Sequence, residues 1–107
     1  MSGSSQTDLA AEVLRNRFAV RLRTELMVDE AEYDRLRALL ARVADVWRST
    51  EALDKELVRA VYSQVSAVAP MADYMSSRRH PMAARAREIA VALEEGLMDA
   101  LDLVRKT

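Results

Sequence analysis

Few residues in this sequence of 107 could carry out chemistry. It contains one histidine, His80, and no cysteine, which excludes thiolate catalysis, sulfur-ligated metals and any site that needs paired imidazoles. No Glu-x-x-His pair, His-Glu-x-x-His motif, Gly-x-Ser-x-Gly elbow or glycine-rich phosphate loop occurs. We therefore expect no catalytic residues, no metal and no cofactor, and the sequence predicts a protein that is not an enzyme.

Two charged clusters have ordinary structural explanations. The first consists of four carboxylates near the end of the sequence: Glu94, Glu95, Asp99 and Asp102. Oxygen ligands on a regular helix are poorly placed to surround a cation, so we expect a solvated face there. The second consists of four arginines: Arg15, Arg17, Arg21 and Arg23. Because Glu12 and Glu25 stand at intrahelical pairing distance from two of them, nucleic-acid binding is the less favoured explanation.

The segment from Pro70 to Met82, which reads PMADYMSSRRHPM, differs in composition from the rest. Residues 69–87 carry four arginines against Asp73 alone, a local charge of +3 (four minus one) in a chain of net charge −1. One interpretation is a protein-binding patch, because methionine, tyrosine and arginine are enriched at interfaces. Its residues are Met71, Tyr74, Met75, Arg78, Arg79 and Met82.

Two other interpretations of this segment stay open. In the first, an anion binds at the start of the last helix, where free N–H groups and the helix dipole favour phosphate or carboxylate. The residues of that site are Arg78, Arg79, His80 and Arg85, although Pro81 removes one donor. In the second, the methionines and the tyrosine close one end of a helical bundle while the arginines face water. The sequence alone does not decide among the three.

The composition predicts one soluble all-α domain. Half of the residues are apolar, 31% are charged, and two glycines and two prolines are too few for a turn-rich β fold. We expect residues 1–6 to be a disordered N-terminal tail and residues 7–107 to form a single helical-bundle domain. With no signal-peptide pattern and no stretch near the ~20 apolar residues of a membrane span, we expect a cytoplasmic protein. The predominance of arginine over lysine fits a GC-rich bacterial genome.

Apolar residues recur with helical period in four segments. The first helix is expected from Thr7 or Asp8 to about Met27, with a buried stripe that includes Leu14, Phe18, Val20 and Leu22. The second helix begins after Asp29, because Asp29 and Glu32 have the spacing of a capping box, and the two helices form a tight antiparallel hairpin.

The second half of the chain contains two further predicted helices. We favour a break after Ser49, since a continuous helix would bury several polar residues, and the third helix then ends before Pro70. The last helix is expected to open at Pro81 and to contain Gly96. We predict a four-helix bundle with an antiparallel first hairpin and either a crossover or a short helical turn at residues 70–80.

These observations favour a small non-enzymatic protein-interaction module of the adaptor, regulator, inhibitor or immunity type. It would bind a protein partner through helix surfaces and residues 70–82, and we also expect self-association into a homodimer or larger homo-oligomer. The alternative is an anion- or nucleic-acid-binding regulator that uses the arginine cluster at the start of the last helix. No membrane partner is expected.

Overall fold

The fold is a bundle of helices, seen in a computed structural model that describes residues 2–50 and 52–106, with side chains for residues 6–50 and 52–101. The predicted all-α class is confirmed, and the described residues contain no strand. The helices are α1 (Ser2–Arg15), α2 (Phe18–Glu25), α3 (Glu30–Arg48), α4 (Lys55–Ser66), α5 (Val68–Ser77) and α6 (Ala83–Lys106).

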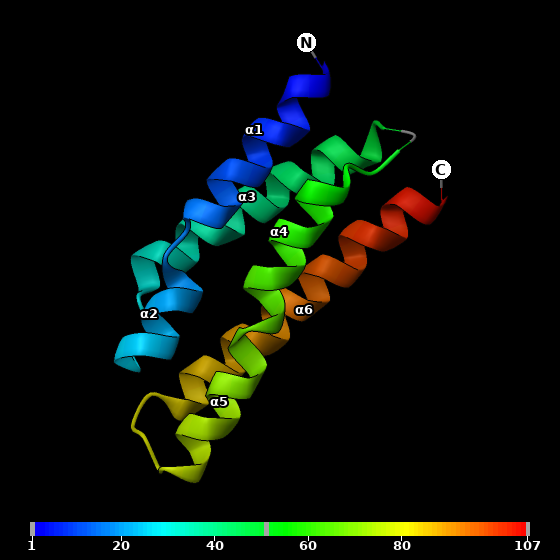
Figure 1. The fold of residues 1–107 in the computed structure, drawn as a ribbon. Coiled ribbons are helices and arrows are strands. Elements are labelled where there is room, and N and C mark those ends of the chain that lie inside the picture. The colour runs from blue at the N-terminus through cyan, green and yellow to red at the C-terminus, as the bar shows by residue number, and fades with distance from the viewer. Residues whose placement is uncertain (1, 51, 107) are drawn as a thin grey trace.

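These helices build four rods, because α1 with α2 and α4 with α5 each form one interrupted rod (Figure 1). The first rod runs antiparallel to α3 and packs on it, as the sequence predicts for the first hairpin. α1 also packs on α4, and α6 packs on α3, α4 and α5. α3 and α4 make little contact although they are consecutive, so they occupy diagonal corners of the bundle.

The predicted single helix from Thr7 to Met27 is wrong in two respects. The chain leaves helical geometry at Asn16 and Arg17, where the Asn16 side chain accepts a local hydrogen bond from the N–H of Phe18 (3.0 Å). α1 also begins at Ser2, so the predicted disordered tail is helical over residues 2–6. The side chain of Gln6 accepts from the N–H of Asp54 (3.0 Å), which ties the start of α1 to the α3–α4 loop.

The starts of α3 and α4 can be compared with the predicted ones. Asp29 accepts a hydrogen bond from the N–H of Glu32 (3.1 Å) and caps α3, which confirms the predicted start. The predicted break after Ser49 is also confirmed, and Asp54 caps α4. The N–H of Glu56 donates to the Asp54 carboxylate at 2.8 Å.

Residues 70–80 adopt the helical alternative and not the crossover. Pro70 is the third residue of α5, where the backbone N–H that proline lacks would have no helical partner. α5 therefore continues the rod of α4 past a bend at Ala67, and the diagonal connection of the bundle is the α3–α4 loop. α6 begins at Ala83, two residues after the start predicted at Pro81.

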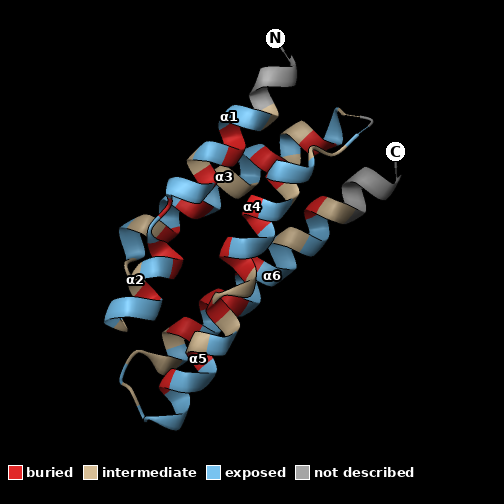
Figure 2. Cartoon of the chain, in the orientation of Figure 1, coloured by how far each residue is buried: buried red, intermediate tan, exposed pale blue. Residues whose placement is uncertain are grey.

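The core is one continuous cluster of apolar side chains between the four rods (Figure 2). Its largest fully buried members come from all six helices and include Phe18, Trp47, Met75 and Ile89. Trp47 is fully buried in this core. Among the described residues, no helix is long and apolar enough to cross a membrane.

Candidate functional site

The methionines of the segment at residues 70–82 belong to the core of the bundle. Met75 is fully buried, and Met71 and Met82 are half-buried and pack against the core. These three side chains close the end of the bundle between α5 and the start of α6. This agrees, for the methionines, with the interpretation in which the segment closes one end of a helical bundle. Met75 is thus not part of the exposed surface, because the periodicity of α5 turns it inward with Val68 and Ala72.

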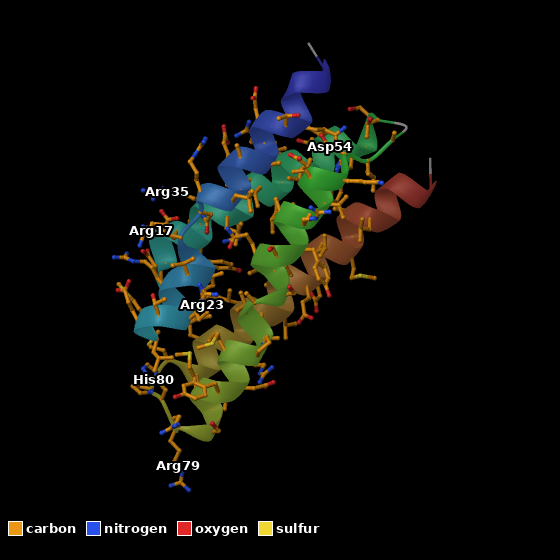
Figure 3. The ribbon with its side chains drawn as sticks, in the orientation of Figure 1. Arg17, Arg23, Arg35, Asp54, Arg79 and His80 are labelled. Atoms are coloured by element: carbon orange, nitrogen blue, oxygen red, sulfur yellow. The ribbon has the colours of Figure 1, made fainter. Side chains whose placement is uncertain are left out.

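Three members of the predicted protein-binding patch remain on the surface: Tyr74, Arg78 and Arg79. Tyr74 is 43% exposed, and the guanidinium of Arg78, one helical turn later, lies 5.2 Å from the centre of its ring. Arg79 has a positive φ of 55° at the end of α5 and points away from the bundle (Figure 3). Tyr74 and Arg78 therefore form one stacked pair, and Arg79 stands apart from it.

The four residues of the predicted anion site do not converge on a common point. The Nδ1 atom of His80 accepts a hydrogen bond from the backbone N–H of Met82 (3.0 Å). This N–H, just before α6, is therefore not free to bind an anion. Arg85 forms two hydrogen bonds of 2.9 Å with the carboxylate of Glu30 on α3. That pairing lowers the pKa of Glu30 and raises the pKa of Arg85. Only Arg78 and Arg79 remain free to meet an anion.

An apolar groove between the first rod and α4 was not expected from the sequence. It has a volume of about 230 Å³ and is lined by Leu14, Ala19, Val20, Arg23, Ser63, Gln64 and Ala67. Leu14 is 60% exposed and Val20 is 41% exposed, although the sequence analysis assigned both to a buried stripe. For these two residues the assignment is wrong, because the interruption at Asn16 and Arg17 separates their two helices, whereas Phe18 and Leu22 of the same predicted stripe are buried.

Tyr74 lies on α5, beyond the end of the groove at Ala67. Asp73 pairs with Arg87, so the Asp73 edge of α5 faces α6. Tyr74 lies on the opposite edge of the buried stripe, which is the edge towards α2, and α2 packs on α5. Seven residues separate Ala67 from Tyr74, which places Tyr74 about 10 Å further along the same side of the rod.

We call this surface the α2/α5 face and define it by six residues: Leu14, Val20, Arg23, Ala67, Tyr74 and Arg78. Arg23 and Arg78 are exposed and form no ion pair with any described residue. The groove lining holds no carboxylate. The α2/α5 face therefore combines exposed apolar side chains with unneutralised positive charge. One residue in the sequence could have indicated that Leu14 and Val20 are exposed. Asn16 lies between them, and asparagine favours helix caps over helix interiors.

Two larger grooves lack this combination. One, of about 380 Å³ between α1 and α3, contains the ion pairs Arg42–Glu12 and Arg35–Glu32, which neutralise most of its charge. The other, of about 370 Å³ between α3 and α6, is lined mainly by small residues such as Ala41 and Gly96. Among the described residues, no three histidine, aspartate or glutamate side chains come together to hold a metal ion.

Comparison with known proteins gives no further information on the function. No protein-family profile matches this sequence, and neither the search of characterised proteins nor the search of solved structures finds a match.

Proposed function

We propose that this protein is a non-enzymatic protein-interaction module, and that its α2/α5 face binds an amphipathic helix of a partner protein. The observation that carries this proposal is the exposure of Leu14 and Val20 at the mouth of one groove. Exposed aliphatic side chains that line a groove between helices are the usual receptor for the apolar side of a bound helix. Tyr74 extends the surface with a residue type enriched at interfaces.

The charge of this face defines the partner further. Arg23 and Arg78 flank the apolar residues, and no carboxylate lines the groove. A bound helix that carries aspartate or glutamate beside its apolar side chains would pair with both arginines. Complementary charge of this kind speeds association and rejects partners of the wrong sign. We therefore specify an acidic amphipathic helix.

The polar groups of the face support binding and not catalysis. The amide of Gln64 is committed to the backbone carbonyls of Val13 and Asn16 (2.7 and 3.1 Å). Arginine does not exchange protons near neutral pH, and the groove lining holds no histidine or carboxylate that could act as a general acid or base. The anion-binding alternative has less support, because His80 caps α6 and Arg85 is paired with Glu30.

Site-specific photo-crosslinking in the source cells tests the proposal. A photoreactive side chain is placed at Leu14 or Tyr74 on the α2/α5 face, and at Ala41, an exposed residue of α3, as the matched control. We expect the same discrete adduct from the first two positions and none from the third. Addition of Val20→Glu should abolish the adduct at Leu14, because it introduces a carboxylate into the groove. Adducts from Ala41 alone, or no adduct from either face position, would refute the proposed function.

A further inference from the structure

The C-terminal half of α6 has the properties of the helix that the α2/α5 face should bind. Between Arg87 and Arg105, α6 carries five carboxylates and no lysine or arginine: Glu88, Glu94, Glu95, Asp99 and Asp102. The side chains of Glu94, Glu95 and Asp99 are exposed and form no ion pair with any described residue. Residues 94–99 of α6 therefore carry acidic side chains that no described residue neutralises.

Helix stability does not explain these carboxylates. Glu95 and Asp99 stand four residues apart, a spacing at which like charges repel each other on a helix. A local arrangement that opposes stability points to a role in binding.

An exposed apolar edge accompanies the acidic residues. Met98 is 55% exposed and Val91 is 46% exposed. Met98 follows Val91 by seven positions, a spacing that places both side chains on one side of α6. Methionine adapts its shape to irregular partner surfaces. The segment from Val91 to Asp99 is thus a short amphipathic helix with acidic flanks.

We propose that this acidic segment of one molecule binds the α2/α5 face of a second molecule. Met98 and Val91 would cover Leu14, Val20 and Tyr74, while the carboxylates would pair with Arg23 and Arg78. Within one chain the two surfaces do not meet, since neither α1 nor α2 makes substantial contact with α6 (Figure 1). The proposal rests on the proposed function, because it uses the same receptor face.

The arrangement is head to tail, because two different surfaces meet. Such contacts produce rings when the rotation closes and open chains when it does not. A second copy on the α2/α5 face would exclude the partner helix from that surface. Self-association would therefore regulate partner binding by competition.

Charge reversal on each surface tests the contact. One variant carries Arg23→Glu with Arg78→Glu, and the other carries Glu95→Arg with Asp99→Arg. Sedimentation of the full chain at several concentrations should show association of the wild type at low ionic strength and its loss at high salt, because salt screens exposed charges. We expect each variant alone to associate about tenfold more weakly or worse, since each then opposes like charges. An equimolar mixture should recover association, because each variant offers the charge that the other lacks.

A control variant separates this contact from a general effect of charge. Arg37→Glu with Arg48→Glu changes the net charge by the same amount as the first variant, but at exposed positions on α3. It should associate as the wild type does, and circular dichroism should show that all variants fold. A wild type that stays monomeric at every concentration would overturn the inference, as would a mixture of folded variants that fails to associate. Those outcomes leave the proposed function standing if Leu14 and Tyr74 still crosslink to a different protein, while an adduct of twice the 12.0 kDa chain supports the second copy.

Discussion

The side-chain amide of Gln64 on α4 donates a hydrogen bond to the backbone carbonyl of Asn16, which is 3.1 Å away and 48 residues earlier in the sequence. The same amide donates to the carbonyl of Val13 at 2.7 Å. Both Gln64 and Asn16 are buried, and the Asn16 side chain donates in turn to the carbonyl of Glu32 (3.0 Å). A buried polar network thus holds the chain between α1 and α2 in a non-helical conformation.

Replacement of Gln64 by leucine should destabilise the fold. The substitution keeps the side-chain volume but removes the Gln64 donor from the buried carbonyl of Asn16 and leaves that of Val13 with only the N–H of Asn16, which costs about 1–3 kcal/mol. The free energy of unfolding in urea measures the effect. The neighbouring Ser63→Ala, at an exposed position, should change it by less than about 0.5 kcal/mol. Equal stability of Gln64→Leu and the wild type would show that the network contributes nothing.

Arg79→Gly should stabilise the protein. Arg79 has a φ of 55°, and a side chain in this left-handed region costs about 1–2 kcal/mol that glycine avoids. The adjacent Arg78, with a φ of −95°, provides the control, since glycine there only adds freedom to the unfolded chain. Thermal unfolding should show a higher midpoint for Arg79→Gly and a lower one for Arg78→Gly. Equal shifts of the same sign would contradict the role of the backbone angle.

Gly96→Ala should also stabilise the protein, by about 1 kcal/mol, because alanine favours the helix and glycine does not. A Cβ atom added at Gly96 meets no atom within 4 Å, so the substitution introduces no clash. The reverse change at Ala92, an exposed residue one turn earlier, should destabilise by a similar amount. Chemical denaturation of both variants checks the two signs, and a destabilised Gly96→Ala would mean that this position needs its glycine.

The Glu30–Arg85 pair should make stability depend on pH in the acidic range. Arg85 lowers the folded-state pKa of Glu30, so the carboxylate stabilises the fold above its unfolded pKa of about 4.3. This contribution is lost as the pH falls through the lower, folded-state pKa. Thermal midpoints of the wild type and Glu30→Gln should differ by a constant amount above pH about 5 and converge below pH about 4. A difference that persists unchanged at the acidic end would show that the pair acts by packing and not by charge.

The features predicted correctly are those that neighbouring residues specify. Helical period identifies the all-α class and buries Trp47, and Asp29 caps α3 through the N–H of a residue only three positions away. The break after Ser49 follows from polar residues that a continuous stripe would bury. In each of these cases the interacting groups are close in sequence, so their spacing carries the information.

The α2/α5 face depends on contacts that spacing does not reveal. Leu14 and Val20 fit a buried stripe until Gln64 and Glu32 reach across from other helices and hold the chain out of helix at Asn16. Arg85 belongs to a basic cluster in the sequence until Glu30, 55 residues earlier, engages it. By itself the sequence determined the class of fold, the start of α3 and the scarcity of catalytic groups. Only the tertiary structure decided which apolar and charged side chains stay exposed, because hydrogen bonds between residues far apart in the chain interrupt the helix and neutralise the charge.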